Sequence, residues 1–247
     1  MRVTMVGHST VILEGAGTRL LTDPYFGSFG NLAYARLAPP SMSRDDVGPV
    51  DGVLVSHGHW DHTDRKFLRG LDARVPILVP AGTSFVMRLK GVRNAIPMKP
   101  WESRMVGSAS ITAVPAVHIA RTAGYVVEMD GVTAYFAGDT YHRPFMSEIA
   151  RRFHIDVALM PVATFRIPPT MGEGGAVAAV RDIRPSTVIP IHLDIQPRSP
   201  LLRSGQSAAG FARRLREAGL TAEVVPLAEG EAWESRAALA SQARISA

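Results

Sequence analysis

Residues 52–62 read GVLVSHGHWDH, and this stretch decides the fold. Its first four residues form a short apolar segment that is typical of a buried strand. Four potential metal ligands follow within six residues: His57, His59, Asp61 and His62. A loop at the end of a strand can turn several such side chains toward one point, whereas a continuous strand or helix cannot do so for all four. Imidazole and carboxylate together suit zinc, and also manganese or iron. A polar turn with hydrogen-bonded histidines is the alternative, but the density of ligands favours a metal site.

Three more polar side chains follow apolar, strand-like segments. His118 comes after residues 111–117, Asp139 after residues 135–138 and His192 after residues 188–191. Each of them alone is a weak signal, since a structural or surface role is equally plausible. We expect polar residues placed just past buried strands to converge at one edge of the sheets. The seven residues together would supply enough ligands for two metal ions with open positions.

The composition narrows the class of protein. The chain has 247 residues, of which 46% are hydrophobic and 20% charged, so a disordered or fibrous protein is excluded. No apolar run approaches the roughly 18 residues of a membrane span, and the first residues lack a signal-peptide core. The absence of cysteine excludes disulfides, thiolate nucleophiles and Cys-type zinc sites. We therefore expect a cytoplasmic protein with one domain over residues 1–247, ending in a partly ordered tail at 227–247.

The formal net charge of +5 raises the question of a nucleic-acid partner. Of the 27 basic residues, 24 are arginine, and they are spread along the chain. The tightest groups, Arg151-Arg152 and Arg213-Arg214-Arg216, lie on helix-like stretches where solvated helix faces are expected. The charge pattern therefore disfavours nucleic-acid binding. A small-molecule substrate is the expected partner, and a homo-oligomer stays open.

The predicted elements change in character along the chain. Asp130-Gly131 marks a hairpin, and hairpins dominate the first half, whereas strands and helices alternate in the second. Two sheets with helices outside them accommodate this mixture. We expect strands at residues 3–6, 10–14, 19–22, 52–55, 75–79, 111–115, 125–128, 132–137, 157–161, 187–191 and 221–225. We expect helices at residues 63–71, 83–90, 144–153, 173–183 and 207–218.

A long irregular segment at residues 23–50 separates the opening strands from the ligand-rich stretch. A loop of this length in a compact domain is usually functional or mobile. Its apolar content is high for a surface loop: Tyr25, Phe26, Phe29, Leu32, Tyr34 and Leu37. These residues could form a substrate lid or pack beneath the loop as a satellite core, and both interpretations stay open. Residues 164–170 could form an opposing wall, in which Arg166 could pair with a carboxylate or phosphate.

The sequence resembles the metallo-β-lactamase superfamily of metal-dependent hydrolases. The resemblance rests on His57-x-His59-x-Asp61-His62, His118, Gly138-Asp139-Thr140 and His192. Three further stretches are similar to the branch that contains L-ascorbate-6-phosphate lactonase: Gly7-His8-Ser9-Thr10, Leu21-Thr22-Asp23-Pro24 and Gly124-Tyr125-Val126. N-acyl phosphatidylethanolamine phospholipase D has a similar opening. The similarity runs over about residues 3–193 and is specific for the superfamily, but not for the substrate.

The resemblance implies an α/β fold, a four-layer αββα sandwich of two mixed β-sheets flanked by helices, with the site at one edge. It further implies that His57, His59 and His118 hold a first metal ion, and that Asp61, His62 and His192 hold a second, with Asp139 bridging both. The chain departs from the family pattern at His192-Leu193-Asp194, where relatives often continue with an aromatic residue and Gly-Thr. It departs again at Tyr141-His142, where glycine is common after the threonine. Both departures lie on the expected substrate side.

The expected chemistry follows from two divalent metal ions, zinc before manganese or iron. They would share a water, lower its pKa toward neutrality and supply a hydroxide that cleaves a lactone, ester or amide bond of a small anionic molecule. Asp61 could also accept the proton. His142 could act as a proton donor, or it could be an exposed loop histidine.

Two further residues have open roles. His8 could orient a ligand, contact substrate or be a buried strand-end histidine. Asp23 could accept an imidazole N–H or simply begin the turn at Pro24.

Three other functions compete with this one. A phosphodiesterase that acts on a lipid or nucleotide is the nearest, and basic side chains near the site would favour it. Di-iron redox chemistry on this fold generally needs a flavin partner domain, for which no segment is left. A non-catalytic nucleic-acid-binding or scaffold protein has no need of a complete ligand set.

Overall fold

Two seven-stranded mixed sheets form the centre of the protein in a computed structural model that describes residues 1–235. In the first sheet β1, β2 and β3 are antiparallel, while β3, β5, β6 and β7 are parallel. The spatial order of this sheet is β16 (Ala232–Glu234), β1 (Arg2–Gly7), β2 (Thr10–Gly15), β3 (Thr18–Thr22), β5 (Gly52–Leu54), β6 (Ile77–Pro80) and β7 (Ala95–Met98).

The second sheet has the same mixed character. Strands β8 to β11 are antiparallel, and β11, β12, β13 and β15 are parallel. Its spatial order is β15 (Glu223–Val224), β13 (Thr187–Ile191), β12 (Val157–Pro161), β11 (Val132–Phe136), β10 (Gly124–Met129), β9 (Ala109–Val114) and β8 (Ser103–Val106).

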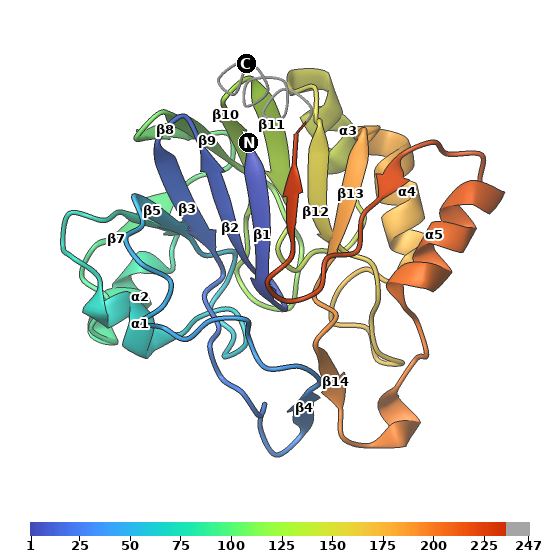
Figure 1. The fold of residues 1–247 in the computed structure, drawn as a ribbon, viewed down its shortest axis with the longest axis horizontal. Helices are drawn as coiled ribbons and strands as arrows, with labels where there is room; N and C mark the ends of the chain where they lie inside the picture. The colour runs from blue at the N-terminus through green and yellow to red at the C-terminus, as the bar shows by residue number, and fades with distance from the viewer. Residues whose placement is uncertain (236–247) are drawn as a thin grey trace, which may run out of the picture.

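Helices cover the outer faces of both sheets (Figure 1). Phe67 of α1 (Arg65–Gly70) and Met87 of α2 (Ser84–Leu89) belong to an apolar cluster with residues of the first sheet. The second sheet is covered by α3 (Phe145–Arg152), α4 (Glu173–Ile183) and α5 (Ala208–Glu217), which contribute to a second cluster. A third cluster fills the space between the sheets. The four-layer αββα sandwich is therefore confirmed.

One tyrosine ties the two sheets together by hydrogen bonds. Tyr125 of β10 is fully buried, and its hydroxyl lies 2.9 Å from the carbonyl oxygen of Val55 and 3.1 Å from that of Leu78. Leu78 lies in β6 of the first sheet, and Val55 directly follows β5 of the same sheet. The contact therefore fixes the sheets relative to one another close to the end of β5, where the ligand-rich loop begins.

Several expected loops contain short strands. In the long segment at residues 23–50, β4 (Tyr34–Arg36) pairs with β14 (Ile195–Pro197), and the pair lies beyond the ends of both sheets (Figure 1). A 3₁₀ turn, η1 (Pro200–Leu202), follows β14. The base of the long segment is a packed satellite core, because Phe26, Val47 and Val50 are buried against the first sheet.

The segment predicted as a partly ordered tail, residues 227–247, contains a strand. Residues 232–234 form β16, which pairs with β1 as an edge strand of the first sheet. Residues 236–247 of that tail lie outside the described residues. Among the described helices none is long and apolar enough to span a membrane.

Candidate metal centre and substrate cleft

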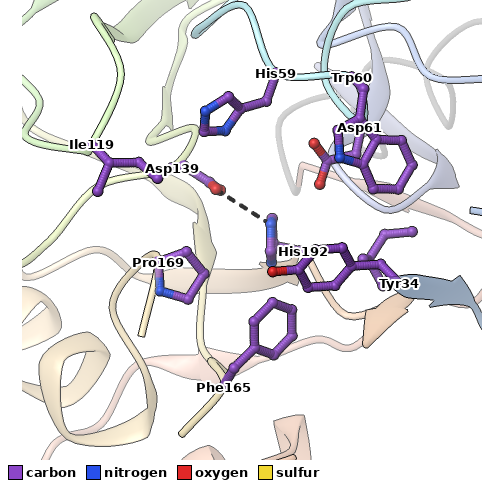
Figure 2. A pocket seen from close by; sticks show the side chains of 10 residues that line it. Tyr34, His59, Trp60, Asp61, Ile119, Asp139, Phe165, Pro169 and His192 are labelled. Atoms are coloured by element: carbon purple, nitrogen blue, oxygen red, sulfur yellow. Dashed lines mark ion pairs between the residues drawn. The ribbon is translucent and has the colours of Figure 1, made fainter. Parts of the chain in front are cut away.

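The seven predicted ligands all lie in loops that follow strands, and the fold brings them together at one edge. His57, His59, Asp61 and His62 follow β5, while His118, Asp139 and His192 follow β9, β11 and β13. Figure 2 shows His59, Asp61, Asp139 and His192 around one cleft. Close backbone packing contributes to this convergence. Gly138 has a φ of 55°, and a Cβ at this position would lie 2.3 Å from Cβ of Ser56.

Three imidazoles form the first ligand group. One nitrogen each of His57, His59 and His118 lies within 4.8 Å of the others. Nδ1 of His59 lies 2.9 Å from Nε2 of His57 and 3.2 Å from Nε2 of His118. A tetrahedral zinc ion with ~2.0–2.1 Å bonds places its nitrogen ligands roughly 3.3 Å apart. The spacing therefore fits one shared cation.

The second ligand group contains Asp61, His62 and His192, with His8 beside them. Asp139 lies between the two groups. One of its oxygens, Oδ2, is 3.3 Å from Nε2 of His192 and 3.9 Å from Nε2 of His118. The other, Oδ1, is 3.7 Å from Nε2 of His62. A single carboxylate is thus within reach of a cation in either group.

Unpartnered polar atoms indicate what this cluster is suited to hold. His62 Nε2 and Asp139 Oδ1 are buried and have no hydrogen-bond partner. Buried polar atoms are normally satisfied, and leaving one unpaired costs about 1–3 kcal/mol. Imidazole nitrogen and carboxylate oxygen are also ligand atoms that bind zinc in proteins. The residues present therefore fit a pair of divalent cations.

The electrostatics prepare most of these side chains for metal binding. Burial lowers the pKa of His57, His59 and His118, so their imidazoles are neutral at pH 7, the form that ligates metals. Burial alone would raise the pKa of Asp139, but the imidazoles of His192 and His62 outweigh it and hold that pKa well below its usual range.

His62 differs from the other imidazoles. Burial would lower its pKa, but Asp139, Asp23 and Asp61 outweigh this effect and raise it to about 10. The metal-free protein therefore carries a proton on His62 that a cation must displace.

Asp23 orients His62 from the side opposite the cleft. Its fully buried carboxylate lies 2.6 Å from Nδ1 of His62 and accepts hydrogen bonds from the main-chain N–H of Ser56 at 2.6 Å and its hydroxyl at 2.5 Å. Of the two roles considered from sequence, the imidazole acceptor is the one that the geometry supports. Sequence reasoning did not single out Ser56, although its place directly before His57 offered a signal.

His8 lies within the second ligand group. Its Nε2 is 3.5 Å from Oδ2 of Asp61, and its ring centroid is 4.3 Å from that of His192. The backbone of His8 has a φ of 59°, its N–H donates to Asp194 at 2.6 Å, and its carbonyl accepts from the N–H of His192 at 3.0 Å. Asp194, one of the departures from the family pattern, thus fixes His8 and was missed from sequence.

Two predicted site residues point elsewhere. Nε2 of His142 is 2.8 Å from Oδ2 of Asp182 on α4, so its ring is held by that helix and does not line the cleft. Arg166 is exposed, and its Nε donates to the carbonyl of Arg203 at 3.2 Å. The proton donor expected at His142 and the anion partner expected at Arg166 are therefore not placed at the site.

The cleft beside the ligands has a volume of about 230 Å³. Four polar residues, His59, Asp61, Asp139 and His192, form one side of its lining, and apolar or aromatic residues form the rest. The latter are Tyr34, Trp60, Ile119, Phe165, Pro169 and Ile195. No lysine or arginine of residues 1–235 lines it.

Comparison with known proteins places the chain in a family. Residues 18–193 match the family described as the beta-lactamase superfamily domain. A UPF0173 metal-dependent hydrolase of Archaeoglobus fulgidus is 30% identical, covering 95% of this chain and 99% of the relative. A UPF0173 metal-dependent hydrolase of Methanopyrus kandleri is 33% identical, covering 95% of this chain and 100% of the relative.

Solved structures share the fold at lower identity. A possible metal-dependent hydrolase from Veillonella parvula has a TM-score of 0.79 at 18% identity, over 94% of this chain and 98% of the other. An isothiocyanate hydrolase from Delia radicum gut bacteria has a TM-score of 0.78 at 20% identity, over 95% and 99%. The family match over residues 18–193 and the two UPF0173 relatives show that the chain belongs to the metallo-β-lactamase superfamily and, within it, to the UPF0173 metal-dependent hydrolase family.

Proposed function

We propose that this protein hydrolyses a lactone, ester or amide bond of a small molecule with the help of two divalent cations, for which zinc best suits the donor set. His57, His59 and His118 would hold the first cation, and Asp61, His62 and His192 the second. The observation that carries the proposal is the place of Asp139, whose carboxylate lies within 4 Å of imidazole nitrogens from both groups. A carboxylate placed between two ligand groups suits a site for two metal ions.

Divalent cations held by these residues would supply Lewis acidity and, by lowering the pKa of water toward neutrality, a hydroxide at pH 7. The protein's own residues position and protect this chemistry. Burial would raise the pKa of Asp61, but His62, His8 and His192 outweigh it, so the carboxylate is ionised at neutral pH, the form that ligates a metal. The role of Asp61 as a proton acceptor stays a prediction from sequence. Asp23 keeps one His62 proton on Nδ1, so the proton that a cation would displace is the one on Nε2.

The lining of the cleft favours a carboxylic-acid derivative over a phosphodiester. Arginine matches phosphate oxygens through paired hydrogen bonds, and no arginine or lysine among the described residues lines this cleft. An anionic substrate of the kind expected from sequence would therefore meet positive charge only at the two proposed cations. The narrower resemblance to the L-ascorbate-6-phosphate lactonase branch stays a prediction.

The test compares metal-free and zinc-loaded protein on a γ-lactone, an ethyl ester, an anilide and bis(p-nitrophenyl) phosphate. We expect turnover of at least one carboxylic substrate that disappears below ~0.1 metal per chain and returns with zinc. His118→Ala should lower kcat/KM by roughly 100-fold or more. His154→Ala, which removes a histidine with an 86% exposed side chain, should not change it. Hydrolysis that survives metal removal would refute the mechanism, and faster turnover of the phosphodiester would refute the bond class.

A further inference from the structure

Three aromatic rings form a continuous wall on one side of the cleft. Tyr34 stacks on Phe165, with ring centroids 5.6 Å apart and planes 30° apart. On its other side Tyr34 lies 6.4 Å from Trp60. All three side chains are half-buried and line the cleft beside the proposed metal ligands (Figure 2). We call these three residues the aromatic wall.

The wall is assembled from segments that are far apart in the sequence. Trp60 lies between two proposed ligands, Tyr34 is in β4 and Phe165 follows β12. Buried Tyr25 supports Trp60 from behind in an edge-on contact at 5.3 Å. Pairing of β4 with β14 holds Tyr34 in place. These contacts make the wall a preformed surface rather than a flexible lid.

Apolar side chains also face the wall across the cleft. In the view of Figure 2, Ile119 and Pro169 lie on the side opposite Trp60 and Tyr34, with the polar ligand residues between them. Ile119 is 76% exposed, so its side chain is accessible to a bound molecule. A group bound here would therefore touch apolar atoms on two sides and the polar residues on a third.

The arginines of the segments that hold the wall are already engaged. Arg36 donates from Nη1 to the carbonyl of Gly27 at 2.8 Å, and Arg198 donates from Nε to that of Asn31 at 2.9 Å. Arg166 donates to a main-chain carbonyl as described above. These guanidinium groups therefore stabilise the loops, and the aromatic wall itself offers apolar contact without a cationic side chain.

We propose that the substrate carries an uncharged, flat apolar group, an aromatic ring above all, next to the bond that is cleaved. Trp60, Tyr34 and Phe165 would determine this specificity. The cleft volume of about 230 Å³ is below the usual ~300–1,000 Å³ of ligand pockets, which limits the group to about one ring. Aromatic rings stack favourably on such a wall and gain from its desolvation. This inference rests on the proposed function, because it places the reacting bond beside the metal ligands.

The first test uses zinc-loaded protein and three ethyl esters in a pH-stat: ethyl phenylacetate, ethyl butyrate and monoethyl succinate. We expect kcat/KM for ethyl phenylacetate to exceed that of both others by roughly tenfold or more. Phe165→Ala should reduce this preference about fivefold or more without loss of bound zinc. Tyr34→Ala should do the same, whereas Tyr34→Phe keeps the ring and should retain the preference. Phe85→Ala, which removes a 69% exposed ring on α2, is the matched control.

A second measurement separates this inference from the proposed function. Saturation-transfer NMR would compare benzylacetone with methyl butyl ketone, two uncharged ketones that cannot be hydrolysed. We expect stronger transfer to the phenyl protons of benzylacetone, lost in Phe165→Ala. If esters are cleaved but ethyl butyrate or monoethyl succinate is preferred, the substrate class is wrong while the hydrolase stands. If no ester is cleaved but benzylacetone binds at the wall, hydrolysis of esters is excluded and the aromatic subsite stands. Equal transfer to both ketones overturns the inference.

Discussion

Replacing Asp23 with asparagine should weaken metal binding without removing any proposed ligand. In the native protein the carboxylate of Asp23 accepts from the Ser56 main-chain N–H and hydroxyl and lies 2.6 Å from Nδ1 of His62. An asparagine keeps the size but replaces one acceptor oxygen with an N–H₂ donor. This donor, facing Nδ1, favours the tautomer whose proton is on Nε2. Nε2 is the atom that must be free to bind the second cation.

The expected magnitude follows from the bonds that change. One hydrogen bond to a charged group contributes about 1.5–3 kcal/mol, and the His62 contact is the one that asparagine reverses. Groups that orient a ligand typically affect metal affinity by about 10–100-fold. The two estimates agree, because each 1.4 kcal/mol corresponds to a factor of about ten. We therefore expect Asp23→Asn to weaken the second zinc by roughly 10–100-fold and the first zinc much less.

Competition with a chromophoric chelator measures both affinities in one titration. Asp51→Asn is the matched control, because exposed Asp51 also accepts a main-chain N–H, from Arg19 at 2.8 Å, far from the ligands. A circular dichroism spectrum and a melting curve would show that Asp23→Asn is folded at the assay temperature. Native-like affinity for two zinc ions in folded Asp23→Asn would refute the role assigned to Asp23.

Three further outcomes are expected. The pKa of His62 is raised to about 10, so this side chain is protonated at pH 7 without metal. Zinc loading should therefore release a proton from it, and zinc affinity should rise with pH from 6 to 9. A pH-independent affinity measured by competition titration would contradict this. Tyr125→Phe removes the hydroxyl that links the sheets and should lower the free energy of unfolding by about 1–2 kcal/mol. The measurement is a urea titration, in which the midpoint should fall at an unchanged m-value. An unchanged midpoint would count against the link. Gly138→Ala places a Cβ 2.3 Å from that of Ser56 and should lower the number of zinc ions bound per chain, measured by plasma mass spectrometry. Full zinc occupancy in this variant would show that the close approach is dispensable.

The central strands and the ligand cluster could be predicted from the sequence because their signals are local. Short apolar runs precede His57, His118, Asp139 and His192. In the structure the strands β5, β9, β11 and β13 end at Leu54, Val114, Phe136 and Ile191, shortly before these ligands. A polar residue just past a strand therefore indicated that its side chain would lie near the other ligands. The αββα arrangement itself was predicted from the family resemblance. The change along the chain, from hairpins to alternating strands and helices, also favoured it.

Short strands that depend on distant partners were missed. The pairing of β4 with β14 joins residues about 160 positions apart, and neither segment shows alternation that would predict it. Strand β7 contains Pro97, a residue that normally argues against a strand. It is tolerated because β7 lies at the edge of its sheet. Strand β16 likewise depends on its partner β1.

The side-chain directions of loop residues were the other limit. His142 was placed near the site from its spacing to Asp139, and Arg166 as part of the wall at residues 164–170. The path of each loop decides whether such a side chain faces the cleft. The ring of His142 forms a hydrogen bond with Asp182 on α4, and the Arg166 guanidinium donates to the main-chain carbonyl of Arg203. Such partners come from tertiary packing, which sequence spacing does not encode. Tyr34, by contrast, was singled out for its apolar character and does line the cleft.

An anomalous difference map from zinc-loaded crystals, recorded at the zinc absorption edge, tests the central claim most directly. We predict two peaks, each ~2.0–2.2 Å from its ligand atoms. One should be bound by His57, His59 and His118, and the other by Asp61, His62 and His192, with Asp139 contacting both. A single peak, or peaks held by other side chains, would contradict a two-metal hydrolase.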